Sequence, residues 1–182
     1  MRLMMQTLLA ERFQLVIHSV TADAPVFALV LVKPGVGGPH LKAHPSSDAC
    51  GVAAPEQSSP TAPSSVGDLP PVCGVIAHVP SSLLGQHYGG RGVPLSLFAT
   101  SVPTMTGLAA MPRPVVDQTG LSGLYDFTLT WMHDPNGQDG AVADNTGNFR
   151  DALRNQLGLE LKSSRAPISF LVVDHVERPS GN

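Results

Sequence analysis

The stretch that decides the fold occurs in two versions, as ERFQLVIHSVTADAPVFALVLV at residues 11–32 and as NQLGLELKSSRAPISFLVVD at residues 155–174. Each version begins at the end of a helical pattern, continues as an alternating apolar stretch, and reaches a β-branched run after a turn. The versions align without a gap up to the turn. The second turn is shorter by two residues, and Pro25 is then matched with Pro167. This internal repeat predicts two copies of a helix–strand–strand unit.

A third strand is predicted from YDFTLTW at residues 125–131, where Tyr125, Phe127, Leu129 and Trp131 alternate with polar residues. A helix–strand–strand unit has to bury one face of its hairpin under its helix. Two such units and this strand predict an α+β fold, with one mixed or antiparallel sheet and helices on one face.

Local patterns predict the remaining elements. Residues 1–12 carry a helical stripe of apolar side chains, and a second helix is expected from residue 93, with Pro103 stopping or kinking it. Residues 113–117 (RPVVD) predict a short strand. A last helix is expected from Phe149 to Leu157, with Asn148 as its N-cap.

A long segment between these elements differs in composition. Residues 33–94 hold ten prolines, ten glycines and six charged residues, which is typical of turns and loops. We therefore interpret residues 1–182 as a single domain that contains a Pro/Gly-rich insert at 34–92. We expect at most one short strand in the insert, at residues 72–79.

Charge and hydropathy exclude two classes of partner. The formal net charge is -3 and the pI is near 6.1, with lysine and arginine scattered, which argues against nucleic acid. No apolar run is long enough to predict a membrane span. The first residues, MRLMMQTLL, do not resemble a signal peptide, and the chain as written is expected in the cytoplasm.

Four strings carry a family resemblance: QTLLAERFQLVIH, RGVPLSLFA, RPVVDQTGLSGLYDFTLTW and ALRNQLGLELKSSRAPISFLVVDHVERPSGN. Together they make the chain similar to the large soil-associated, mainly acidobacterial family of secreted proteins whose domain has no assigned function. The resemblance implies an extracytoplasmic location and a small α/β domain. It implies no activity.

Members of that family carry a signal peptide and a further stretch before the LLAERF helix, and this chain does not show them. The sheet is therefore expected to have exposed edges. Because exposed edges pair with other strands, we expect a homodimer or a swapped assembly.

Cys50 and Cys73 both lie in the Pro/Gly-rich insert, and each precedes a glycine. In an exported family, this pair predicts a disulfide that closes a loop of about 24 residues and stabilises by roughly 3 kcal/mol. Two free thiols, for a chain that stays in the cytosol, and a metal-binding pair are the alternatives.

The histidines offer a metal site as one interpretation. His40 and His44 have i, i+4 spacing, but prolines and glycines around them argue against a helix, and the spacing loses its meaning. Asp174 and His175, with His133 or Asp126 as a further ligand, would make a divalent-metal hydrolytic site. The alternative is that these histidines lie on the surface or at the sheet edge.

Asp117 precedes a turn that leads towards Asp126, and two carboxylates that meet there would share a proton. The alternative is that Asp117 accepts hydrogen bonds from the backbone of Thr119 and Gly120 in an Asx turn. No nucleophile elbow, phosphate-binding loop or zinc-protease motif is present.

Two functional hypotheses follow. The first is an extracytoplasmic binding or interaction module of unknown ligand, since catalytic motifs are lacking and the aromatic stripe of residues 125–131 is expected in the core. The second is a small promiscuous hydrolase of activated esters or phosphate esters. It would use Asp174 and His175, with Asp117, Asp126 and His133 as further candidates and a divalent metal ion as a candidate cofactor.

Overall fold

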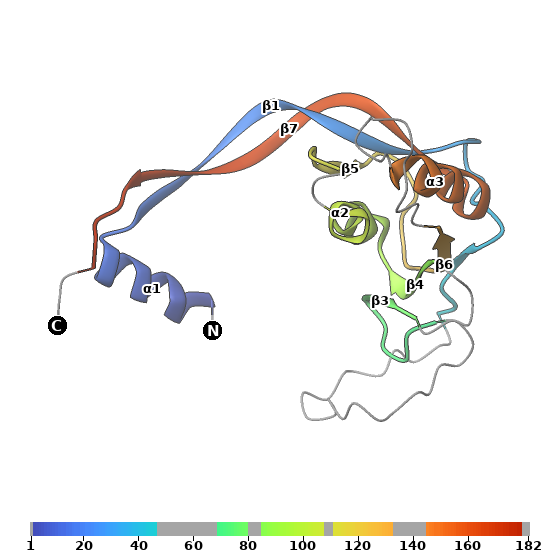
Figure 1. Cartoon of the computed structure of the whole chain (residues 1–182), viewed down its shortest axis with the longest axis horizontal. Helices are drawn as coiled ribbons and strands as arrows, with labels where there is room; N and C mark the ends of the chain where they lie inside the picture. The colour runs from blue at the N-terminus through green and yellow to red at the C-terminus, as the bar shows by residue number, and fades with distance from the viewer. Residues whose placement is uncertain (1, 47–68, 80–84, 108–110, 133–144, 180–182) are drawn as a thin grey trace. The chain divides into compact units, whose positions relative to one another are not determined.

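The computed structural model of the chain describes residues 2–46, 69–79, 85–107, 111–132 and 145–179 (Figure 1). Its contacts divide the chain into two compact units. Unit 1 comprises Met1–Pro25 and Arg165–Asn182, and unit 2 comprises Val26–Ser164.

The described chain contains both helices and strands. Their order is α1 (Arg2–Phe13), β1 (Val16–Leu31), β2 (Leu41–Ala43), β3 (Val75–His78), β4 (Gln86–Val93), α2 (Leu95–Thr106), β5 (Val115–Asp117), β6 (Tyr125–Trp131), α3 (Asn145–Ala152), a π-helical turn (Leu153–Leu157) and β7 (Leu159–His175). Strands β1 and β7 contribute residues to both units.

The strands form two sheets. One has the order β2-β6-β4-β3 and is antiparallel throughout. The other has the order β5-β1-β7, with β5 parallel to β1. Strand β7 runs antiparallel to β1, because Thr21 contacts Ser169 while His18, earlier in β1, contacts Asp174, later in β7.

Unit 2 holds the hydrophobic core, and α2 and α3 lie between its two sheets (Figure 1). Phe98 of α2 meets Phe127 of β6 edge to face, with ring centroids 4.9 Å apart. Trp131 at the end of β6 meets Phe149 of α3 in the same way, at 5.1 Å. Aromatic pairs of this kind add to the stabilisation that burial alone supplies.

The apolar side chains that alternate along β6 are the ones that are buried. Phe127, Leu129 and Trp131 are each no more than 3% exposed, and Tyr125 packs half-buried against the same core. The prediction that this aromatic stripe belongs to the core is confirmed.

Unit 1 contains helix α1, the first part of β1 and the second part of β7. Gln14 adopts a positive φ of 48° between helix and strand, and the Phe13 carbonyl accepts a hydrogen bond of 2.7 Å from the Glu177 amide. Ala166 is the one buried residue among those that the structure describes in this unit. A hollow of about 400 Å³ lies between α1 and the start of β1, lined by Gln6, Leu9, Ala10, Leu15, Val16 and Ile17.

The α+β class is confirmed, and both versions of the repeat consist of a helix followed by extended chain. The predicted hairpins are wrong, however, because β1 and β7 are each one continuous strand. The segments 21–24 and 163–166 contain no glycine or asparagine for a tight turn, and the alanines that precede Pro25 and Pro167 favour extended backbone. Each long strand has the other as its pairing partner.

The single predicted sheet is also corrected to two. The segment 34–92, predicted as a loop with at most one strand, contains β2, β3 and most of β4. Strand β4 (QHYGGRGV) contains three glycines and depends on its ladders to β3 and β6 more than on strand propensity. The short strand expected at residues 72–79 is present as β3.

Two helix boundaries differ from the prediction. Helix α2 continues past Pro103 to Thr106, because Val102 and Met105 on either side of the proline are buried in the core. Helix α3 begins at Asn145, so Asn148 lies inside it instead of capping it. Gly158 ends the following π-helical turn in the left-handed conformation, with φ 67°.

Gly38 and Gly158 allow the backbone after β1 to approach the π-helical turn, because a Cβ on either would meet the backbone of the other segment. The Gly38 amide donates to the Leu157 carbonyl at 2.7 Å, and the His40 amide donates to the Gln156 carbonyl at 2.9 Å. A Cβ at Gly38 would lie 2.4 Å from both the Gln156 carbonyl oxygen and the Gly158 amide nitrogen. Both neighbours are backbone atoms, so neither can rotate away.

We therefore predict that Gly38→Ala lowers the free energy of unfolding of unit 2 by about 2–4 kcal/mol. The matched control is Gly37→Ala, where a Cβ would meet the tip of the Leu41 side chain at 3.3 Å, and we expect a change below about 1 kcal/mol. Trp131, the single tryptophan, lies in the core of unit 2, and its fluorescence during urea unfolding reports this measurement. Equal effects of the two substitutions would contradict the close approach.

Candidate functional site

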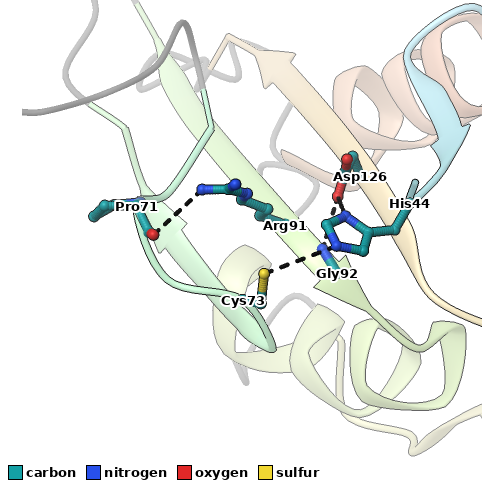
Figure 2. A network of polar contacts seen from close by, with 6 residues as sticks. All are labelled: His44, Pro71, Cys73, Arg91, Gly92 and Asp126. Carbon is teal, nitrogen blue, oxygen red and sulfur yellow. Dashed lines mark hydrogen bonds and ion pairs between the residues drawn. The ribbon is translucent and has the colours of Figure 1, made fainter. Parts of the chain in front are cut away.

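The polar face of β6 carries the clearest constellation of functional groups in unit 2. Asp126 projects from β6, His44 follows β2 directly, and Cys73 lies in the turn before β3 (Figure 2). The register pairs Lys42 with Asp126, and His44 therefore lies just past the end of this ladder.

His44 and Asp126 form a close pair. The imidazole Nδ1 lies 2.8 Å from Asp126 Oδ1, and the two side chains are 4% and 17% exposed. An ionised carboxylate only accepts hydrogen bonds, so Nδ1 is assigned as the protonated nitrogen. The His44 amide donates to the Leu124 carbonyl at 2.8 Å, which fixes the backbone under the ring.

A β-bulge in β4 supplies the second partner of Asp126. The ladder between β4 and β6 shifts register between Gly90 and Val93, and Gly92 adopts a φ of 58°. A bulge leaves an amide outside the ladder. The Gly92 amide donates to Asp126 Oδ1 at 2.7 Å, so one carboxylate oxygen serves both the bulge and the imidazole.

The turn that carries Cys73 is held against the same bulge. The Gly74 amide donates to the Arg91 carbonyl at 2.8 Å, and the Arg91 guanidinium donates to the Pro71 carbonyl at 3.3 Å (Figure 2). Cys73 Sγ then lies 3.9 Å from His44 Nε2.

This arrangement places a sulfur, an imidazole and a carboxylate in series. With Nδ1 donating to Asp126, the lone pair of neutral His44 is on Nε2, the atom that faces Cys73. A carboxylate behind an imidazole fixes its tautomer and stabilises its protonated form. The pair can therefore accept and hold a proton at Nε2.

Within unit 2, the predicted site residue Asp117 has partners of its own. Asp117 accepts hydrogen bonds from the amide and the hydroxyl of Thr119, at 2.9 and 2.7 Å, as in the Asx-turn alternative. Asp117 and Asp126 thus have different partners.

Asp174 and His175 lie in unit 1 and are exposed. Asp174 contacts the Nδ1 of His18 at 2.7 Å, and His175 contacts Glu177 at 2.9 Å, so these neighbours on β7 do not pair with each other. His133 and Cys50 lie outside the described residues. The metal site and the Cys50–Cys73 disulfide therefore stay predictions.

Within the part of the chain that the structure describes, no three His, Cys, Asp or Glu side chains are grouped so that they could hold a metal ion. Of the helices described there, none is long and apolar enough to cross a membrane.

A charged pair of a simpler kind lies on β7 within unit 2. The pKa of the Glu160 carboxyl is lowered, chiefly because Lys162 donates a hydrogen bond to it at 2.9 Å. Desolvation opposes this shift, and the charges of Lys162 and Arg154 add to it. Lys162 is 62% exposed, as expected for a surface ion pair of small energetic value.

Sequence reasoning named Asp126 and missed His44 as its partner. The signal was absent because β2 is only three residues long and follows a Pro/Gly-rich stretch, where no strand is expected from the pattern. Without β2, nothing in the spacing of residues 44 and 126 brings them together.

The fold and the site together define a two-unit α+β protein with a buried histidine–aspartate pair held next to a sulfur. The chain belongs to the family described as "Protein of unknown function (DUF3738)", whose model matches residues 1–176 and so spans both units. No curated protein and no solved structure matches the chain. The resemblance to a domain without an assigned function is confirmed.

The His44–Asp126 pair leads to a prediction about stability. Asp126→Ala would leave the Gly92 amide and the His44 Nδ1–H without their acceptor in a largely buried place. We expect a loss of about 2–4 kcal/mol in the free energy of unfolding of unit 2, measured by urea with Trp131 fluorescence. Glu160→Ala, which removes an ion pair with an exposed lysine, is the control and should cost under about 1 kcal/mol. A cost for Asp126→Ala no larger than that of the control would show that the pair does not hold the bulge.

Proposed function

We propose that this protein is an extracytoplasmic interaction module, and that unit 1 carries its binding surface. The location follows the family resemblance of the sequence. The surface is the apolar ribbon, defined as Val16–Pro25 of β1 and Arg165–His175 of β7 together with the adjoining Val176.

One observation carries the proposal: most of the large apolar side chains described in unit 1 are exposed. Leu171 is 72% exposed, and the least exposed of the set, Val172, is still 37% exposed. The eleven residues concerned are Met4, Met5, Leu8, Val16, Ile17, Val20, Phe170, Leu171, Val172, Val173 and Val176. Apolar surface gathered in this way marks a site of association.

Unit 2 provides the contrast within the same chain. Its core contains fully buried leucine, valine and phenylalanine side chains from both sheets and both helices. The same chain buries many large apolar side chains in unit 2. The exposure of such side chains in unit 1 therefore needs its own explanation. Binding to a partner is the explanation that the surface supports.

The edges of the ribbon indicate how a partner would bind. Strand β7 is the outer strand of its sheet, and the pairing of β1 with β5 involves only Phe27–Leu29, beyond the ribbon. Edge strands offer their amides and carbonyls to an added strand, with affinity from the main chain and selectivity from alternate side chains. The module would therefore bind an extended polypeptide segment.

A fluorescein-labelled peptide with the sequence RAPISFLVVD, copied from residues 165–174, tests strand addition to the full chain by fluorescence anisotropy. We expect saturable binding with a Kd of roughly 1–100 µM. The same peptide with N-methyl groups on alternate residues cannot extend a ladder and should not bind. Leu171→Lys in the protein should weaken binding at least about tenfold, because a charge replaces a contact at the ribbon edge.

Circular dichroism and Trp131 fluorescence establish that the Leu171→Lys chain is folded. The matched control is Leu97→Lys in unit 2, where the side chain is 39% exposed on α2 and lies outside the ribbon. Absence of saturable binding by the unmodified peptide, or equal binding of the N-methylated one, would rule out strand addition.

A further inference from the structure

We infer that the partner of the apolar ribbon is a second copy of this chain, paired β7 to β7 in antiparallel orientation about a two-fold axis. The inference rests on the proposed function and names the partner of that same surface. Three features of β7 support it.

The first feature is an unprotected edge. Strand β7 lies at the edge of the β5-β1-β7 sheet, and residues 166–173 contain no charged residue. Natural edge strands that stay unpaired carry charges, bulges or short lengths that discourage pairing. Pro167 lacks an amide donor near the start of this stretch, so the shared ladder would run over residues 168–173.

The second feature is the order of charges around that stretch. Arg165 precedes it, and Asp174, Glu177 and Arg178 follow it, so the end that follows is acidic on balance. In an antiparallel pair of identical strands, the basic end of one copy lies near the acidic end of the other, and this occurs twice. A parallel pair would bring like charges together. The strand is therefore complementary to itself in one orientation only.

Both charged ends lie on the surface and can take part. The Arg165 side chain is 62% exposed beside Asp23, and the Asp174 side chain is 39% exposed beside His18. Charged groups at the rim of an interface contribute chiefly to orientation and to the rate of association. Their role here would be to select the antiparallel arrangement, while the ladder and the apolar side chains supply the affinity.

The third feature is the amount of apolar surface. Eight large apolar side chains belong to the ribbon, and their exposed fractions run from 37% to 72%. At roughly 50–100 Å² each they offer on the order of 600 Å², which is at the low end of the area per partner in a specific interface. The ribbon of one copy is thus large enough to meet that of another.

The mass of the full chain in solution tests the inference, by sedimentation equilibrium over a concentration series. A second copy gives a species of twice 19.0 kDa that dissociates on dilution. Leu171→Lys should raise the dimer dissociation constant at least about tenfold, and Leu97→Lys should leave it unchanged.

Charge exchange tests the antiparallel orientation. Arg165→Glu and Asp174→Lys each place like charges together across the two-fold axis, so each alone should weaken the dimer several-fold. The double variant carries both exchanges and restores opposite charges at both ends, so its dissociation constant should return towards that of the unaltered chain. Circular dichroism accompanies each variant, because Arg165 and Asp174 also contact Asp23 and His18 within one chain.

The outcomes separate this inference from the proposed function. A chain that stays monomeric at about 1 mM, above the Kd range expected for the peptide, overturns the second copy as partner. If that monomer still binds the labelled peptide, the interaction module stands with a different partner; if it does not bind, both fail. A dimer that is unaffected by Leu171→Lys, or a double charge variant as weak as the single ones, overturns the antiparallel β7 interface.

Discussion

The two faces of β6 determine most of unit 2. Its apolar face, with Phe127, Leu129 and Trp131, fixes where α2 and α3 pack, because both helices present aromatic rings to it. Its polar face carries Asp126, and the bulge of β4 and the imidazole of His44 are both arranged around that carboxylate. A shift of one residue in the register of β6 would exchange the faces and remove the core and the site together.

A polar side chain that is distant in sequence satisfies backbone groups at the outer edge of β6. Strand β2 begins at Leu41, opposite Phe127, so it does not reach as far along the outer edge of β6 as Thr130. There the side chain of Gln156 accepts from the Thr130 amide at 3.0 Å and donates to the Thr130 carbonyl at 2.7 Å. A side-chain amide thus replaces one residue of a missing strand. The π-helical turn that contains Gln156 supplies this contact.

Local patterns were enough to predict β6, β3 and the approximate positions of the helices, because alternation, turn residues and helix formers act over a few residues. They were not enough for β2 and β4, which are stabilised by their ladders, nor for His44, whose partner is 82 positions away in sequence. The two hairpins predicted from the repeat are wrong for a related reason. An Ala-Pro step between two apolar runs resembles a turn in isolation, but it stays extended in β1 and β7, where a long neighbouring strand is available. The predicted α+β class is nevertheless correct, because a fold class depends on the kinds of element present more than on how the strands pair.

The two units differ in how their free energy is balanced. Unit 2 offsets the entropy of folding with a buried core, whereas a two-stranded ribbon in water is at best marginally stable on its own. In unit 1 the described contacts are a ladder, exposed ion pairs such as Arg165–Asp23, and partly buried side chains such as Leu9 and Phe13. Exposed ion pairs contribute little to stability. If a partner strand covers Phe170–Val173, the free energy of that association adds to the stability of unit 1 by mass action. Binding of the partner and ordering of the ribbon are then coupled. The fraction of chains with an ordered ribbon therefore rises with the concentration of the partner, which lets an interaction module respond to that concentration.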